Sequence, residues 1–140
     1  MSSIKVAKQY IKELSVKVPK SPEIFATTHS KPNIEISINL EARKISDQSY
    51  EVILQLTAVA DSGNLFEITS DYAGIFYFEK EFATEDLEEI LLVECPTLLF
   101  PFARNIISNC AIDAGFSPLM IDPIDFNLLY EKRRESFTIN

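Results

Sequence analysis

The sequence predicts an α+β fold in which four β-strands are followed by three helices. Up to residue 79, apolar and polar residues alternate over long stretches, as in strands that bury only one face. From residue 84 onwards, apolar residues recur at the spacing of an amphipathic helix. A chain of 140 residues, 46% of them hydrophobic, is long enough for one domain with its own core, which we place at residues 1–140.

The first strand is expected at residues 4–18. Its even positions are mostly apolar and its odd positions mostly polar, and Pro19 ends the alternation. Ala7 and Ile11 interrupt the polar face near its middle. We therefore expect a second contact at these two residues, with another subunit.

Residues 20–32 have no periodicity and predict a long loop that crosses over to the next strand. The only large apolar side chains in this loop are Ile24 and Phe25, which either pin the loop to the core or line a site. The single histidine, His29, lies in the same loop, where a lone histidine is usually a surface residue.

Three further strands are expected at residues 33–43, 50–60 and 65–79, each with alternating residues. Residues 61–64, with the sequence DSGN, predict a hairpin connection in which glycine supplies a positive φ. Short connections favour an antiparallel meander, and the first strand joins it through the crossover loop. Gly74 inside a strand indicates a bulge or a close approach of another backbone.

Helices are expected at residues 84–94, 97–114 and 125–134. We place a break before the second helix because Pro96 suits a helix start, and Pro101 would remove a hydrogen bond inside a helix. At the start of the last helix, an aspartate precedes the apolar pattern and is a candidate cap.

Composition argues against several classes of function. A net charge of −8 and a pI near 4.6 do not suit nucleic-acid binding, which needs a basic surface. One histidine and two cysteines, Cys95 and Cys110, predict neither a metal site nor a disulfide framework, and three glycines form no phosphate-binding loop. We expect no enzyme activity, catalytic residue, metal or cofactor. The N-terminus has no continuous apolar run, so we expect no signal peptide or membrane span, and a cytoplasmic location.

Aromatic residues are abundant, with ten phenylalanines and five tyrosines but no tryptophan. So thin a fold cannot place all of them in its interior. Exposed apolar area of this kind indicates an interface or a binding groove. The candidates are Phe66, Tyr72, Tyr77, Phe100, Phe102 and Phe126.

Four stretches of the chain match sequence signatures of a known protein family. Residues 95–104, CPTLLFPFAR, are similar to a specific family signature, and residues 118–126, PLMIDPIDF, are similar to a second one. Shorter matches lie at residues 73–76, AGIF, and residues 50–52, YEV. The matches follow the family order along the chain, which thus resembles the SecB family of bacterial protein-export chaperones.

The resemblance implies a four-stranded antiparallel sheet with helices on one face. It further implies a homotetramer, a dimer of dimers in which helices lie between sheets. The implied activity is that of a holdase, which binds unfolded precursor proteins in hydrophobic grooves without ATP and delivers them to the SecA motor. The oligomer interface is then expected at Ala7, Ile11, Leu87, Ile90 and Leu91.

The resemblance also implies residues for binding clients. Ile68 could equally be a core or subunit-interface residue, and Pro101 would hold Phe100 and Phe102 off the helical stripe, so that one packs and the other faces a groove. The groove residues implied are Phe25, Phe66, Ile68, Tyr72, Phe102, Phe126 and Tyr130.

Docking of SecA is implied for acidic residues on the outward face of the sheet, namely Glu13, Glu67 and Asp71. The chain departs from the family pattern at Lys17 and Thr69, where acids are expected.

Two other functions fit the sequence less directly. One is a SecB-like chaperone dedicated to a single partner, such as a toxin–antitoxin system. The other is a small-molecule-binding α+β domain, which predicts one enclosed pocket where a chaperone predicts long open grooves.

Overall fold

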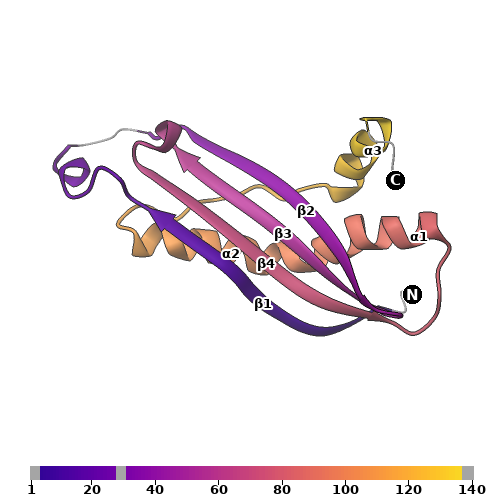
Figure 1. Cartoon of the computed structure of the whole chain (residues 1–140). Helices are drawn as coiled ribbons and strands as arrows, with labels where there is room; N and C mark the ends of the chain where they lie inside the picture. Colours follow the sequence, from indigo (N-terminus) through magenta and orange to yellow (C-terminus); the bar gives the residue numbers. More distant parts are fainter. Residues whose placement is uncertain (1–3, 28–30, 137–140) are drawn as a thin grey trace.

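The computed structural model of the chain is a four-stranded antiparallel sheet with one long helical run packed on it (Figure 1). It describes residues 4–27 and 31–136, except the side chains of 134–136, so His29 lies outside the described residues. The predicted α+β class and antiparallel sheet are confirmed. The strands, in the order β1-β4-β3-β2 across the sheet, are β1 (Ile4–Lys17), β4 (Phe66–Phe78), β3 (Ser49–Ala60) and β2 (Ile34–Ser46).

The helical part differs from the prediction of a break before the second helix. Three segments run on from one another: α1 (Thr84–Glu89), a π-helical turn η3 (Ile90–Glu94) and α2 (Cys95–Asp113). The N–H of Cys95 donates to the carbonyl of Ile90, five residues back. This wider turn accommodates the ring of Pro96, which a regular turn would bring against a carbonyl.

Pro101 also stays within α2 rather than ending it. Its side chain is exposed, as is that of Thr97, whose carbonyl loses its usual helical donor. Because that carbonyl lies on the exposed side, water can replace the lost bond. The final helix is α3 (Phe126–Ser136), and the carboxylate of Asp125 caps it by accepting from the N–H of Leu128 at 3.2 Å.

Two tight connections fix one end of the sheet. Between β3 and β4, a short turn η2 (Asp61–Gly63) has positive φ at all three residues, so the predicted hairpin is present with glycine at a φ of 91°. The crossover loop contains a 3₁₀ turn, η1 (Glu23–Ala26), and returns to the sheet at Asn33. Asn33 donates its N–H to the Asp61 carboxylate at 2.7 Å and accepts the Asp61 N–H at its carbonyl at 2.8 Å.

Strand β1 pairs with β4 through two bulges, and these decide which of its residues face the helices. The register shifts between Val6 and Lys8 and again between Ile11 and Glu13. Each extra residue reverses the alternation of faces. Ile11 pairs with Tyr72 and therefore lies on the helix-facing side of β1, which corrects the prediction that it interrupts the polar face. Ala7 is the extra residue of the first bulge.

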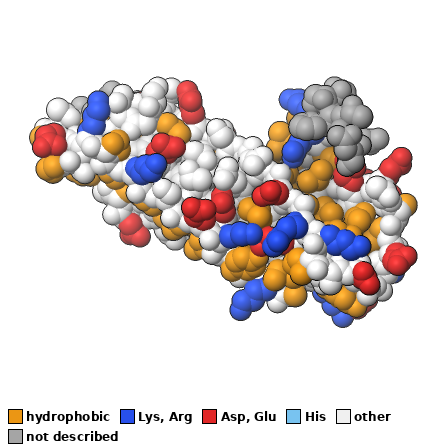
Figure 2. Space-filling view, in the orientation of Figure 1, with side chains coloured by type: hydrophobic (Ala, Val, Ile, Leu, Met, Phe, Trp, Pro, Cys, Tyr) orange, Lys and Arg blue, Asp and Glu red, His pale blue; other side chains and the backbone are white. Residues whose placement is uncertain are grey.

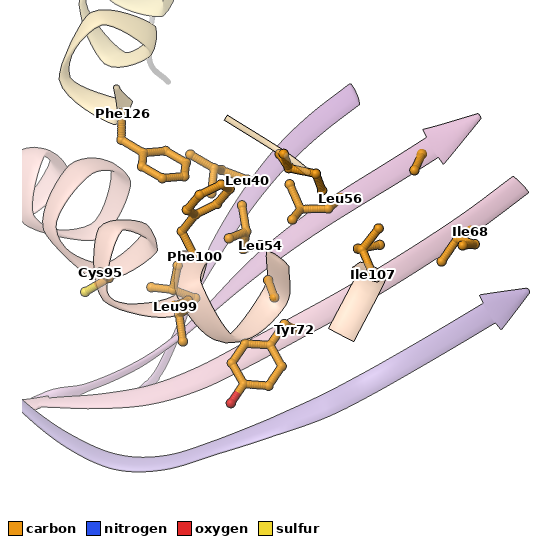
Figure 3. Close-up of a cluster of buried hydrophobic side chains, with 14 of the residues drawn as sticks. Leu40, Leu54, Leu56, Ile68, Tyr72, Cys95, Leu99, Phe100, Ile107 and Phe126 are labelled. Atoms are coloured by element: carbon orange, nitrogen blue, oxygen red, sulfur yellow. The ribbon is translucent and has the colours of Figure 1, made fainter. Parts of the chain in front are cut away.

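The core lies between the sheet and α2. Leu54, Leu56 and Ile68 from the sheet meet Leu99 and Ile107 from α2, and all five side chains are fully buried (Figure 3). Burying one such side chain stabilises the fold by about 1.5–3 kcal/mol.

Gly74 of β4 lets α2 approach the sheet closely. A Cβ at this position would lie 3.0 Å from Leu99 Cδ2 and 2.7 Å from the ring of Phe76. The approach at Gly74 is thus one of side chains and not of another backbone, and both bulges lie in the facing strand β1, so neither feature expected at Gly74 is present in that form.

Candidate functional site

The described part of the chain contains an apolar groove with a volume of about 1190 Å³. It lies where the crossover loop, β2 and the segment following α2 meet (Figure 1). The groove is open to solvent, because Phe25 and Met120 on its walls are 50% and 92% exposed. Its apolar lining consists mainly of Ile24, Phe25, Ile34, Ile36, Ile38, Leu65, Phe66, Phe116, Leu119, Met120, Ile121 and Ile124.

One wall of the groove is a chain of three aromatic rings. The ring centroids of Phe25 and Phe116 are 5.3 Å apart, and those of Phe116 and Phe66 are 4.9 Å apart. Such tilted pairs contribute about 0.5–1.5 kcal/mol beyond their buried area. The crossover loop is thus held against the end of α2 by a contact between aromatic side chains.

Gly115 makes this aromatic contact possible. It has a φ of +98°, and its N–H and that of Phe116 bond back to the carbonyls of Ile112 and Ala111, which ends α2. A Cβ on Gly115 would lie 2.9 Å from the ring of Phe25. Glycine therefore both stops the helix and leaves room for the phenylalanine ring.

The other wall is formed by β2, and sequence reasoning did not identify it. Ile34, Ile36 and Ile38 face the groove and are half-buried. The alternation over residues 33–43 predicts that these side chains share one face, but not that they lie at a sheet edge beside the crossover loop. The segment 116–123, FSPLMIDP, carried the other missed signal, a run of apolar residues outside any helix.

The seven residues predicted for the client groove separate into three places. Phe25 and Phe66 line the groove. Phe102 is 52% exposed on α2, and its ring stacks on Tyr72 of β4 with centroids 6.2 Å apart. The remaining three, Ile68, Phe126 and Tyr130, are 0%, 2% and 6% exposed, and Phe66 and Tyr72 are also buried, at 1% and 9%, so only Phe25 and Phe102 of the seven are exposed.

Ile68 and Phe126 are buried and do not lie in an open groove, because both pack against residues of α2. Ile68 is fully buried in the core cluster that also contains Ile107 of α2, and Figure 3 shows both side chains. The ring of Phe126 packs edge-on against Phe100, with centroids 6.0 Å apart. Phe100 is thus the aromatic that packs, and Phe102 the one that stays exposed.

A second apolar surface runs along the edge strand β1. Four of its side chains, on the face that carries the helices elsewhere, are exposed by 41–48%. Helix α2 covers β3 and β4 but does not extend over this strand. We call this surface the β1 strip: Val6, Ile11, Leu14 and Val16.

The predicted interface residues behave differently from one another. Ala7 and Ile11 on β1 are exposed, as a contact with another subunit would need. Ile90 and Leu91, however, are only 7% and 8% exposed in the single chain, and Leu87 is half-buried. These three helical residues already pack on the chain's own core. The exposed apolar residues of the helical run lie further along it, at Leu98, Phe102 and Ile112.

The helical run Thr84–Asp113 is long and apolar enough to cross a membrane by length and composition, with a mean hydropathy of 1.5 in its most apolar window. A core helix meets the same criterion, and 44% of that window is buried in this structure. Length and composition are therefore only a weak indication of a span here.

The outward face of the sheet carries a buried carboxylate that sequence reasoning also missed. The side chain of Glu51 is 4% exposed and accepts hydrogen bonds from Tyr10 Oη, Lys12 Nζ at 2.9 Å and Arg43 Nη2 at 3.2 Å. Burial raises the pKa of Glu51, but the three donors outweigh it and hold the pKa below its ordinary value. Burial and the Glu51 carboxylate together raise the pKa of Tyr10 to about 12.

The three acids predicted for docking lie on the same outward face, where acidic and basic side chains lie side by side (Figure 2). Glu13 of β1 stands opposite Asp71 of β4, and Lys17 stands opposite Glu67. The carboxylate of Asp71 accepts from Gln55 Nε2 at 2.8 Å. The structure brings Glu13 and Asp71 together, while Lys17 offsets the charge of Glu67.

Little in the described residues indicates bond-making chemistry. No group of three or more His, Cys, Asp or Glu side chains among them could hold a metal ion. Cys95 and Cys110 are free thiols, and burial raises the pKa of both, most strongly for Cys95. The arrangement of residues in the groove favours binding of apolar polypeptide or ligand surface.

Comparison with protein-family models matches residues 1–136 to SecB, described as preprotein translocase subunit SecB. The chain belongs to the SecB family. The resemblance recognised in the sequence is thereby confirmed. Similar relatives include protein-export protein SecB of Rickettsia bellii and of Rickettsia typhi, each 43% identical over 136 residues. Each match covers 95% of this chain and 89% of the relative.

The fold is also similar to a solved SecB-type structure. This is the Mycobacterium tuberculosis SecB-like chaperone in complex with a peptide from the HigA1 antitoxin, with a TM-score of 0.73. The match covers 87% of this chain and 91% of the other, at 10% sequence identity. At that identity the likeness shows a shared SecB-like fold alone.

Proposed function

We propose that this chain is an ATP-independent export chaperone that holds unfolded precursor proteins and transfers them to the SecA motor. The open apolar groove carries the proposal, because Phe25 and Met120 leave much of their apolar surface in water on its walls. The family membership and the names of the Rickettsia relatives support the same function. Apolar contact is non-directional and therefore suits clients of varied sequence.

The groove residues in this proposal are Phe25 and Phe66, with the stacked pair Tyr72 and Phe102 as a second contact for clients. Ile68, Phe126 and Tyr130 support the groove from the core, where their burial places them. An exposed ring such as that of Phe102 offers apolar area to a client without being taken out of the core.

We further propose a homotetramer, built as a dimer of dimers. The β1 strip and the exposed residues Leu98 and Ile112 of α2 supply two separate apolar surfaces on one subunit. Two surfaces are what a dimer of dimers requires, because each generates one two-fold contact. Ile11 belongs to the first surface, and Ala7 lies beside it in the first bulge of β1. Leu87, Ile90 and Leu91 hold the helix that presents the second surface.

The SecA motor would dock on the outward face of the sheet through Glu13, Glu67 and Asp71. A chain with a net charge of −8 favours a basic partner at such a surface, and long-range attraction would speed their encounter. The proposed location is the cytoplasm, where precursors are met before export.

The other candidate functions have less support. A small-molecule domain predicts an enclosed pocket, whereas the groove is open along its walls. A dedicated toxin–antitoxin chaperone has only a fold likeness at 10% identity in its favour, against 43% for the export relatives. An enzyme is disfavoured by the family, and the three glycines of the sequence leave no phosphate-binding loop for ATP.

A direct test combines aggregation and mass measurements. The purified chain should slow aggregation of a chemically unfolded secretory precursor at equal molarity, without ATP. Native mass spectrometry should show a tetramer that gains one precursor mass. A monomer with no effect on aggregation would overturn the proposal, and capture of only one client among several unrelated precursors would favour the dedicated chaperone.

A further inference from the structure

Met120 lies in the extended segment between α2 and α3 that lines the groove (Figure 1), and its side chain is 92% exposed. Its two neighbours behave differently, because Leu119 is half-buried and Ile121 is buried. These neighbours hold the segment on the core, so the fold does not depend on the side chain of Met120. An unbranched thioether adapts to surfaces of varied shape, which suits the wall of a binding groove.

The thioether of Met120 is also the sulfur most open to solvent among the described residues. The chain contains two methionines and two cysteines, and Met1 lies outside the described residues. Cys95 is fully buried and Cys110 is half-buried, and burial raises the pKa of both thiols. Oxidation of a cysteine requires its thiolate and access to solvent, so both thiols are protected at neutral pH. A methionine sulfur reacts without ionisation, so its exposure determines how readily it is oxidised.

Oxidation of Met120 would change the polarity of the groove wall. Its neighbours in the groove lining, Leu119 and Ile121, are apolar. A sulfoxide is polar and carries an oxygen that accepts hydrogen bonds, and an apolar segment of an unfolded polypeptide offers that oxygen no donor. Covering such an oxygen without a donor costs free energy. Because the Met120 side chain lies outside the core, this change weakens the groove and leaves the fold intact.

We propose that Met120 is a reversible oxidation site through which hydrogen peroxide lowers the affinity of the groove for unfolded polypeptide. This inference rests on the proposed function and adds a regulation of the same site. In the reaction, the sulfur lone pair attacks one peroxide oxygen, the O–O bond breaks, and an S–O bond forms. Water leaves after a proton transfer, and two electrons pass from the sulfur to the peroxide. A methionine sulfoxide reductase, with two electrons from thiols, restores the thioether.

Peptide mapping by mass spectrometry tests the site. The full chain is incubated with hydrogen peroxide, and oxidation is followed separately in the peptides that contain Met1, Met120 and the two cysteines. Met120 should be oxidised within about twofold of the rate measured in an isolated peptide of residues 118–123, because it is almost fully exposed. A rate more than about tenfold below that of the peptide would overturn the proposal.

Two variants separate oxidation at Met120 from oxidation elsewhere. Met120→Leu keeps a similar apolar volume, cannot form a sulfoxide, and retains Met1 and both cysteines. Met120→Gln places a polar amide at the same point and imitates the sulfoxide. The probe is a fluorescent peptide rich in leucine and valine, without methionine or cysteine, added after the peroxide has been removed.

Peroxide treatment should weaken binding of this peptide to the unmodified chain at least about fivefold, the effect of covering one unpaired polar group. The treated Met120→Leu variant should bind as it did before treatment. Met120→Gln should bind the peptide weakly before any treatment and should not respond to peroxide. Methionine sulfoxide reductase should restore binding to the oxidised, unmodified chain.

The results separate this regulation from the proposed function. Weaker binding in the unmodified chain but not in Met120→Leu, at an unchanged melting temperature, supports the regulation. Unchanged binding after full oxidation of Met120, an equal loss in Met120→Leu, or a loss that follows a lower melting temperature overturns it and leaves the chaperone function standing. If the untreated chain binds neither this peptide nor an unfolded secretory precursor, the proposed function fails, and the regulation fails with it.

Discussion

The hydroxyl of Tyr10 on β1 donates to the carboxylate of Glu51 on β3, although β4 lies between these two strands. The edge strand is thus tied to the middle of the sheet as well as to its neighbour. Lys12 joins the same carboxylate from the second bulge of β1. Glu51 therefore holds the bulged strand in the register that keeps Ile11 and Leu14 on the helix-facing side.

Glu51→Gln should destabilise the fold, because a neutral amide cannot satisfy Tyr10, Lys12 and Arg43 together. The expected loss in free energy of unfolding is about 1.5–3 kcal/mol, the range for hydrogen bonds to a buried charge. Urea denaturation followed by circular dichroism measures it. Glu41→Gln removes an exposed carboxylate from β2 and should change stability by less than about 0.5 kcal/mol. Equal effects of the two variants would contradict the role assigned to Glu51.

The same carboxylate makes stability depend on pH. Although burial raises the pKa of Glu51, its three donors lower it further, so the folded pKa lies below the ordinary 4.5. The stabilisation is present above pH 4.5 and is lost as the pH falls through the lower, folded value. Melting temperatures measured from pH 7 to pH 3 should fall more steeply for the unmodified chain than for Glu51→Gln.

At high pH the effect comes from Tyr10. Its pKa is raised from 10.0 to about 12, first by burial and then by Glu51, so the unfolded chain ionises first. Stability should be lost between pH 10 and about 12, and Tyr10→Phe should lack this component. A variant that melts with the same pH profile as the unmodified chain would show that the tyrosine is not held as described.

Gly115→Ala should damage the groove more than the fold. The φ of +98° disfavours any L-residue by about 1–2 kcal/mol, and the new methyl group would meet the ring of Phe25. Gly63→Ala is a matched control, since its φ is +91° and no atom lies within 4 Å of a Cβ there. Both variants should lose similar stability, but only Gly115→Ala should weaken client binding in a fluorescence titration. Equal affinities would mean that the contact with Phe25 does not shape the site.

Phe102→Ala should weaken client binding several-fold and leave the tetramer intact. The ring is 52% exposed and stacks on Tyr72, so its loss opens no cavity in the core. Leu98→Ala truncates another exposed residue of α2, 46% exposed, which belongs to the proposed subunit surface, and it should weaken the tetramer rather than client binding. Native mass spectrometry reports the assembly, and dissociation of the Phe102 variant into dimers would place this ring at a subunit contact.

Glu13→Lys should lower affinity for SecA, and the loss should shrink as salt rises, because exposed charges are screened. The pairing of Glu13 with Asp71 concentrates negative charge at this point of the sheet. Glu23→Lys in the crossover loop makes the same change in net charge away from the sheet face and should leave affinity nearly unchanged. Similar losses of SecA affinity in both variants would mean that net charge, and not the position of Glu13, determines the effect.

Much of the fold follows from the sequence, because alternation and helical spacing are local patterns. The four strands and the capped last helix were predicted for that reason. The bulges of β1 were not, since a bulge depends on the partner strand, and so Ile11 was assigned to the wrong face. The break at Pro96 was predicted from a local rule, whereas the π-helical turn before it removes the clash.

The site was harder to predict than the fold. Alternation indicates that Phe66 and Ile68 lie on one face of β4. Only the packing of the folded chain decides that α2 covers Ile68, whereas Phe66 lies beside the groove. The burial of Glu51 gave no signal, although residues 50–52 matched the family, because one glutamate in an alternating strand looks like any exposed residue. Its three partners come from β1 and β2, and only the folded sheet brings them together.

The β1 strip has a consequence for the life of a newly made subunit. Four side chains that are 41–48% exposed resemble, on the chain itself, the unfolded apolar segments it is proposed to hold. A newly made subunit can then either assemble with other subunits or be bound as a client by chaperones that have already assembled. The net charge of −8 opposes non-specific aggregation of the subunits before they assemble. An unassembled subunit that is captured in this way would occupy a chaperone that could otherwise hold an exported protein.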